Sequence, residues 1–198
     1  STETTSQAGD TATFSIGFED YAGNAVVVTS TTDGSSVTYD DQIPVLNPVQ
    51  ITSTNVSSAS ALPNERLAKP GDNISLSFIT PEVLLDNVTV TIATHSITPD
   101  IISDNYTSVY TLLNDDDNGT VPFTIDVSDP AGNSYSLITD NTTDNSLVEY
   151  DKTPPELNFV SFKSDNIYSL YAKVGDNATL SGIASEPLLH DGVSVSLD

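Results

Sequence analysis

The stretch that decides the fold is FTIDVSDPAGN, residues Phe123–Asn133, because the chain carries it a second time as FSIGFEDYAGN, residues Phe14–Asn24. Each copy places apolar side chains at alternate positions, reaches an acidic residue and ends on Ala-Gly-Asn. Such alternation indicates a half-buried β-strand. The glycine supplies the positive φ that a tight turn needs. Each copy therefore predicts a strand that runs into a turn.

The neighbouring segments repeat in the same order. The offset is 109 residues from Phe14 to Phe123 and 111 residues from Tyr39 to Tyr150. KPGDNISLSFITPE, which begins at Lys69, returns 104 residues later as KVGDNATLSGIASE. Loops of unequal length explain the drift in spacing. The repeats predict a module of about 105 to 110 residues, within the usual size of one domain.

The chain is out of phase with this module. Residues 1–39 match the later part of a module, residues 40–151 form one complete module, and residues 152–198 match the opening part of a further module. Neither partial module can bury a full core alone. Parts of a longer polypeptide or neighbouring chains could complete them, and the cut in mid-module favours the longer polypeptide.

Composition narrows the classes of partner. Cys is absent, so core burial, with or without bound ions, must stabilise the fold. With 28 acidic and 5 basic residues the net charge is -23, which argues against nucleic acid or an anionic membrane as a partner and favours cations. The sequence contains no run of about 20 apolar residues that would insert directly into a membrane.

Period-two alternation continues through the complete module, and no amphipathic helix is evident. The predicted strands are 44–52, 73–80, 86–93, 96–102, 106–113, 120–127 and 134–139, with 146–150 continuing the last strand after an interruption. The interruption at 139–145 leaves open a reversal of the chain. About seven short strands predict an all-β fold, a two-sheet sandwich of immunoglobulin type. The predicted core comprises Val49, Ile51, Ile74, Leu76, Phe78, Val88, Val90, Ile92, Tyr110, Leu112, Phe123, Ile125 and Val127.

Four stretches resemble a known family. They are DKTPPELNFVSF (151–162), AKVGDNATLSGIASE (172–186), GTVPFTIDVSDPAGN (119–133) and TTDGSSVTYD (31–40). Together they resemble the bacterial immunoglobulin-like tandem repeats of large surface proteins and adhesins, over nearly the whole chain. The resemblance implies sandwiches strung into a stalk or fibre and identifies no ligand. The junction after Tyr39 departs from the pattern, because DDQIPVL stands where the second junction has DKTPPEL.

Acidic residues gather at the predicted module junctions. If strands alternate up and down, the first junction collects Asp40, Asp41, Glu82 and Asp129. The second junction collects Asp151 and Glu186, facing Asp115, Asp116 and Asp117 of the DDDNG loop. Converging carboxylates and loop carbonyls could bind Ca²⁺, which takes six to eight oxygen ligands. The competing interpretation is that these are solvated turn residues.

An enzyme has little support. His95 and His190 occupy non-equivalent places in their repeats, and neither has a nucleophile or ligand partner at a telling spacing. Surface or loop histidines are the favoured interpretation, and turn acids repeated in each module favour a structural role over a glycosidase pair.

Seven Asn-X-Ser/Thr sequons predict glycosylation, although a chain rich in Asn, Ser and Thr also generates sequons by chance. They lie at Asn55, Asn73, Asn87, Asn105, Asn118, Asn141 and Asn177.

The module junctions carry the mechanical prediction. Pro154 and Pro155 fix φ and restrict Thr153, so the second linker should be short and extended, and Pro44 contributes similarly at the first. We expect a non-catalytic extracellular or cell-surface protein whose modules form a semi-rigid stalk or filament, with calcium at the junctions. Its partners would be neighbouring modules or copies of itself. The alternative is a surface module that binds a glycan or a partner protein.

Overall fold

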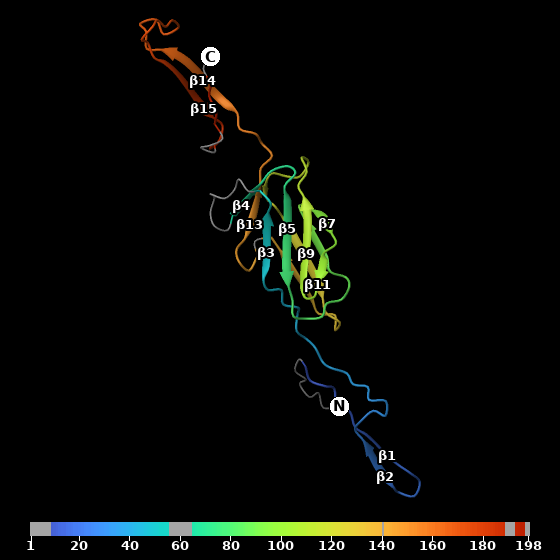
Figure 1. The fold of residues 1–198 in the computed structure, drawn as a ribbon. Helices are drawn as coiled ribbons and strands as arrows, with labels where there is room; N and C mark the ends of the chain where they lie inside the picture. Colours follow the sequence, from blue (N-terminus) through green and yellow to red (C-terminus); the bar gives the residue numbers. More distant parts are fainter. Residues whose placement is uncertain (1–8, 56–64, 140, 189–192, 197–198) are drawn as a thin grey trace. The chain divides into compact units, whose positions relative to one another are not determined.

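The chain forms an all-β structure. The computed structural model describes residues 9–55, 65–139, 141–188 and 193–196, and these residues contain strands, turns and loops without a helix. The chain divides into two compact units, Ser1–Asp151 and Lys152–Asp198. The first unit contains a hairpin followed by the complete sandwich, and the second contains a hairpin (Figure 1).

Two four-stranded antiparallel sheets form the sandwich. The first sheet has the order β3-β5-β9-β8, formed by Val49–Ser53, Asn73–Ile79, Asn105–Thr111 and Asp100–Ile102. The second has the order β12-β11-β6-β7, formed by Ser134–Ile138, Phe123–Ser128, Thr89–Ile92 and His95–Ile97. Side chains of β5 and β11 alternate between the core and the outer face, as their sequence patterns predict.

A smaller three-stranded sheet adjoins them, with the order β10-β13-β4. Its strands are Gly119–Thr120, Leu147–Tyr150 and Glu65–Ala68. β13 is antiparallel to β10 but parallel to β4. Sequence analysis did not predict β4, which gains its partner only when the two distant segments meet in the fold.

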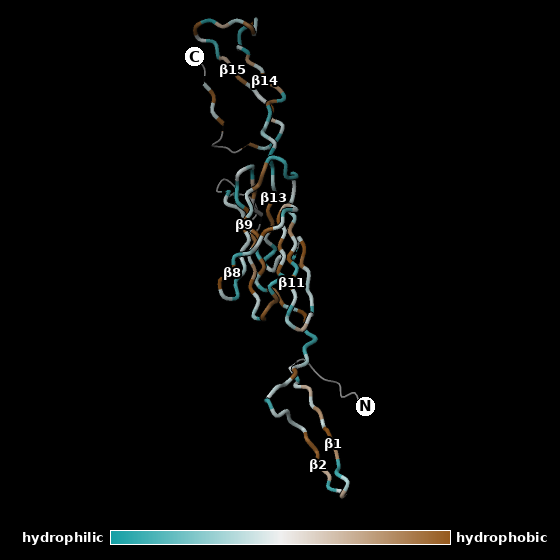
Figure 2. Tube along the Cα trace, turned by 90° about the vertical axis from the view of Figure 1, so that its right-hand side faces the viewer, coloured by the Kyte–Doolittle hydropathy of each residue, from teal (hydrophilic) through white to brown (hydrophobic). Residues whose placement is uncertain are grey.

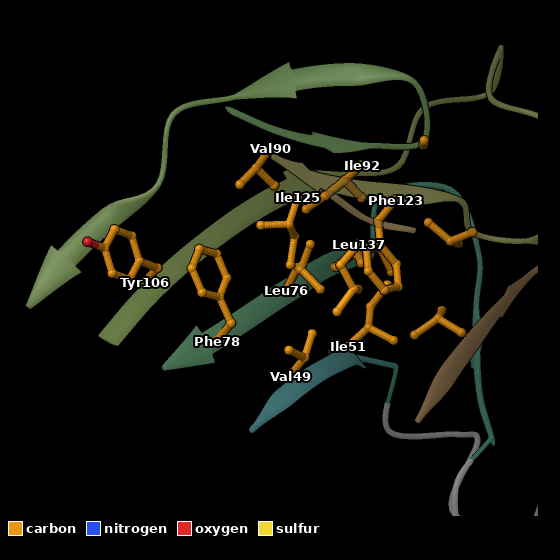
Figure 3. Close-up of a cluster of buried hydrophobic side chains, with 14 of the residues drawn as sticks. Val49, Ile51, Leu76, Phe78, Val90, Ile92, Tyr106, Phe123, Ile125 and Leu137 are labelled. Carbon is orange, nitrogen blue, oxygen red and sulfur yellow. The ribbon is translucent and has the colours of Figure 1, made fainter. Parts of the chain in front are cut away.

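The predicted core is confirmed apart from its margin. Val49, Ile51, Leu76 and their counterparts Phe123 and Ile125 are buried between the two large sheets (Figure 3). Of the predicted set, only Val88 and Tyr110 are half-buried, and both pack against the core. Sequence analysis missed Tyr150, which is fully buried and donates a hydrogen bond from its hydroxyl to the carbonyl of Leu113 at 2.7 Å.

One predicted strand is wrong in its extent. Residues 96–102 are two short strands, because the chain leaves the second sheet after Ile97 and joins the first sheet at Asp100. Pro99 lies at the crossing and cannot donate a backbone hydrogen bond to a ladder. The strand predicted at 120–127 is likewise divided into β10 and β11.

The interruption before β13 does not reverse the chain. β12 pairs with β11 and β13 pairs with β10, both antiparallel, so residues 134–150 run in one direction along residues 119–128. Between them the loop at 142–146 reaches the edge strand β3. Val49 N donates to Thr143 Oγ1 and Ile51 N donates to Ser146 Oγ, each at 2.9 Å. The loop therefore covers an edge that would otherwise expose unpaired backbone groups.

Two hairpins lie outside the sandwich. β1 (Ile16–Glu19) pairs with β2 (Ala25–Val28), and β14 (Leu157–Ser164) pairs with β15 (Ala178–Ala184), both antiparallel. Figure 2 shows that these strands carry apolar residues, as the strands of the sandwich do.

Side-chain hydrogen bonds recur at the repeat offsets. Asp20 accepts hydrogen bonds from Asn24 N and Nδ2 at 2.9 and 2.8 Å, and Asp129 accepts the same two bonds from Asn133 at the same distances. Thr31 Oγ1 donates to the Ser35 carbonyl at 2.8 Å, and Thr142 Oγ1 donates to the Ser146 carbonyl at 2.8 Å. The equivalent segments therefore fold into the same turns.

The pairing of β14 with β15 repeats that of β3 with β5 in register. Ser53 faces Ile74 and Ile51 faces Leu76, while Ser164 faces Ala178 and Phe162 faces Leu180. The loops at their ends also match, because Asp72 accepts hydrogen bonds from Lys69 N and Asn55 Nδ2, and Asp176 accepts them from Lys173 N and Asn166 Nδ2.

Candidate functional site

The chain enters and leaves the sandwich at opposite ends. Asn133 Nδ2, in the turn after β11, donates to the carbonyl of Asp40 at 3.2 Å, which defines the N-proximal end. Tyr150, the last residue of β13, pairs with Gly119 ahead of β11, which defines the C-proximal end. Acidic residues predicted as ligands lie at both ends.

At the N-proximal end, Asp40, Glu82 and Asp129 line one cavity of about 440 Å³, together with Thr38, Val83, Pro130 and Ala131. Up-and-down alternation predicted that these three acids meet, and they do. Asp41 lies outside the lining, where its carboxylate accepts hydrogen bonds from Gln42 Nε2 at 2.7 Å and from the Tyr39 hydroxyl at 3.4 Å.

The three acids that line this cavity have partners of their own. Glu82 Oε1 accepts from Val45 N at 3.2 Å, and Asp40 Oδ1 accepts from Gln42 N at 3.0 Å. Asp129 is buried, and its Oδ1 also accepts from Gly132 N at 2.8 Å. The side-chain hydrogen bond from Asn133 holds the pKa of the Asp129 carboxyl below its usual value, despite the opposing effect of burial.

Asp129 therefore acts first as the organiser of a turn. Asp20 makes the same bonds to Asn24 in the exposed N-terminal hairpin, and the pKa of Asp20 is lowered by the same cause. A turn that forms alike in both places is specified by its own Asp-x-x-Gly-Asn sequence.

At the C-proximal end, Asp115, Asp116 and Asp117 line a cavity of about 220 Å³ with His95 and Thr94. Asp115 and Asp117 are exposed, whereas Asp116 is buried with 7% of its surface accessible. Asp116 Oδ2 accepts from Leu113 N at 2.7 Å, and Asp116 N donates to the Leu113 carbonyl at 3.2 Å. The central carboxylate thus shapes the acidic loop from within.

A histidine and a tyrosine complete this cluster. His95 Nε2 lies 3.1 Å from Asp116 Oδ1, and the Tyr110 hydroxyl donates to Asp116 Oδ2 at 3.0 Å. The two rings stack with centroids 4.7 Å apart. Burial, followed by the hydrogen bond to Asp116, raises the pKa of Tyr110 to about 12. Sequence analysis missed the His95–Asp116 contact, because 21 residues separate the partners and no spacing rule links them.

The hairpin that presents His95 has an unusual turn. Ala93 and Thr94 join β6 to β7 with φ values of 49° and 70°. Two positive φ values in succession are typical of a type I′ turn, which favours Asn-Gly, and a β-branched residue is rare there. The turn brings His95 over Tyr110, where the stacked rings cover part of the acidic loop.

The second predicted junction set is divided between the two units. Asp151 is the last residue of the first unit, and its backbone N donates to the Ala68 carbonyl at 2.9 Å. Glu186 belongs to the second unit and is half-buried.

Calcium at either junction stays a prediction. Within residues 9–55, 65–139, 141–188 and 193–196, no group of three or more His, Cys, Asp or Glu side chains is placed to hold a metal ion. At the N-proximal cavity, Asp129 is committed to its turn, so a cation there would depend on Asp40, Glu82 and loop carbonyls.

The sequons differ in how accessible their acceptor nitrogen is. Asn73, Asn87, Asn105, Asn118, Asn141 and Asn177 are exposed, and Asn55 is half-buried. The amide nitrogen of Asn55 donates to Asp72 Oδ2 at 2.9 Å, and that of Asn177 donates to Asp165 Oδ2 at 3.0 Å. These two nitrogens are engaged in loop structure. His190, the other histidine considered from the sequence, lies outside the described residues.

In the part of the chain that the structure describes, no helix is long and apolar enough to cross a membrane. The chain matches no known family, no curated protein and no solved structure.

Proposed function

We propose that the chain is part of a non-catalytic extracellular protein in which immunoglobulin-like modules follow one another as a semi-rigid stalk or filament. The observation that carries the proposal is the recurrence of the same hydrogen-bonded turns at the repeat offsets. Asp20 with Asn24 repeats as Asp129 with Asn133, and Asp72 with Asn55 repeats as Asp176 with Asn166. Tandem copies of one module account for this recurrence.

The strand order supports the immunoglobulin-like class. The order β3-β5-β9-β8 corresponds to strands A, B, E and D, and the order β12-β11-β6-β7 corresponds to strands G, F, C and C′. β4 then takes the place of a second part of strand A, which crosses to lie parallel to strand G as β13.

The positions of the chain ends support a linear array. The chain enters the sandwich beside Asn133 and leaves it beside Gly119, at opposite ends of the strand pair β10–β11. A module with this path hands the chain on to its neighbour in the direction in which it arrived. Pro44 and the Pro154–Pro155 pair limit the freedom of the two linkers.

Small-angle X-ray scattering on the 198-residue chain, with calcium and then with excess chelator, tests the proposal. We expect an elongated particle in both conditions and, if calcium bridges the junctions, a shorter and more flexible one after chelation. An elongated particle that ignores chelation would remove calcium and leave the stalk supported by its proline linkers. A compact particle would contradict the stalk.

Location needs a separate test. Antibodies against the chain should label intact cells, and protease added outside should remove the label. Label that appears only after lysis would contradict an extracellular role.

A further inference from the structure

The two outer hairpins expose the residues that form the core of the complete sandwich. Ile16 of β1 is equivalent to Ile125 and is 55% exposed, whereas Ile125 is 0% exposed. Phe162 of β14 is equivalent to Ile51 and is 56% exposed, whereas Ile51 is 1% exposed. Each hairpin therefore presents one side of a core without the other side.

The two exposed faces are complementary halves of the same core. In the complete sandwich, Phe123 and Ile125 of β11 face Ile51 and Leu76 of β3 and β5 (Figure 3). The hairpin β1–β2 repeats β11–β12, and the hairpin β14–β15 repeats β3–β5 in register. One hairpin thus supplies what the other lacks.

We propose that the β1–β2 hairpin of one copy packs against the β14–β15 hairpin of a second copy, so that chains assemble head to tail. The proposal rests on the proposed function, because it uses the equivalence of the modules. A second copy is favoured over closure within one copy because the chain enters and leaves the complete sandwich at opposite ends.

A third segment extends the match. In the sandwich the second edge of β11 pairs with β6, where Ile125 faces Val90. Val193–Ser196 reads VSVS and repeats Val88–Thr91, which reads VTVT, at an offset of 105 residues. Val193 and Val195 are exposed, at 55% and 64%. We expect this segment to add a strand to β1 of the neighbouring copy, with Val195 opposite Ile16.

Such an interface is heterologous, since different surfaces of the two copies meet, and its repetition produces an open chain of subunits. The net charge of -23 opposes the approach of two copies. Because salt screens this repulsion, association should strengthen when ionic strength rises.

Sedimentation velocity over a concentration series tests the proposal. The native chain should exceed the 20.9 kDa of one copy at high concentration. Ile16→Asp and Phe162→Asp should each raise the Kd by at least about tenfold, because each places a charge in the apolar contact. Val27→Asp is the matched control: Val27 pairs with Gly17 on the other face of the hairpin, so association should persist.

Mixing the two blocked variants decides the geometry. Each variant retains one intact hairpin, so an equimolar mixture should form a dimer of twice the 20.9 kDa while each variant alone stays a monomer. A mixture that remains monomeric, or a Phe162→Asp variant that still dimerises alone through β1–β2, would overturn the head-to-tail contact.

Engineered cysteines test the register. The chain has no Cys, so a double variant Ile16→Cys with Val195→Cys should give a ladder of disulfide-linked oligomers on oxidation. Val27→Cys with Val195→Cys should give none, and equal ladders from both would overturn the register. A native chain that is monomeric at all concentrations but still elongated in scattering would overturn the assembly and leave the stalk; a compact monomer would overturn both.

Discussion

Aspartates paired with a nearby asparagine fix the turns of this protein at the level of single residues. Asp129 is held by Asn133, Asp20 by Asn24 and Asp176 by Asn166, and in each case the asparagine side chain is the largest cause of a lowered carboxyl pKa. A group whose pKa is lower in the folded state stabilises the fold above its unfolded pKa.

These carboxyls should make stability depend on acid pH. The contribution of Asp129 is complete above about pH 4 and is lost as the pH falls through its lower folded-state pKa. Asn133→Ala should bring that pKa back toward its usual value and flatten the acid dependence of the free energy of unfolding, measured by urea titration at several pH values. Neutralising the net charge of -23 affects both proteins, so the difference between them isolates Asp129. Asn24→Ala is the control, and an equal effect from it would contradict the assignment.

Two buried hydroxyls should respond in opposite ways to removal. Ser108 Oγ is buried without a hydrogen-bond partner among the described residues, whereas Thr80 Oγ1 accepts from Glu82 N at 3.2 Å. Ser108→Ala should leave the free energy of unfolding unchanged or raise it by up to about 1 kcal/mol, and Thr80→Val should lower it by about 1 kcal/mol or more. Denaturant unfolding measures both, and a loss of stability in Ser108→Ala would reveal a partner for that hydroxyl.

Among the elements, the loop at 142–146 connects the two sides of the sandwich. It lies between β12 and β13 and supplies hydroxyl acceptors to the edge strand β3, which pairs with β5 on its other side. Gln50 Nε2 adds a hydrogen bond to Asp144 Oδ2 at 2.8 Å. The interruption of the last strand is therefore part of the structure that closes the edge.

Removing one of these hydroxyls tests that role. Ser146→Ala leaves the backbone N of buried Ile51 without its acceptor, which should cost about 1 to 3 kcal/mol in the free energy of unfolding. Ser35 is the equivalent residue in the N-terminal hairpin, where it is exposed, so Ser35→Ala is a matched control that should change little. Equal effects of the two variants would show that the loop does not stabilise the edge of β3.

At the scale of the whole molecule, equivalent sequences occupy different environments. The complete sandwich buries its apolar face between two sheets, while each outer hairpin has that face exposed. The stability of the first unit should therefore depend on the sandwich far more than on the hairpin.

A pair of equivalent substitutions measures this difference. Ile125→Ala should lower the free energy of unfolding by about 2 to 5 kcal/mol, because it leaves a cavity in the core. Ile16→Ala should have little effect in dilute protein, since Ile16 is already exposed. A cost at Ile16 that appears only at high protein concentration would indicate that a second copy covers β1.

The sequence by itself determined the strands, the repeat and most of the core. Alternation identified Ile74, Leu76 and Phe78 as buried, because successive side chains of a strand point to opposite faces. The repeat also placed Asp40, Glu82 and Asp129 at one end of the sandwich, since up-and-down strands return their loops to the same end. These features depend on local periodicity and chain direction, which are written in the order of residues.

Only the tertiary structure decided which distant residues meet. The parallel pairing of β4 with β13, the division of residues 96–102 between two sheets and the contact of His95 with Asp116 depend on packing between segments far apart in the chain. No spacing in the sequence encodes them, because each is selected by the geometry of the assembled sheets. The free energy that holds them comes from burying the shared core, which exists only when both sheets are in place.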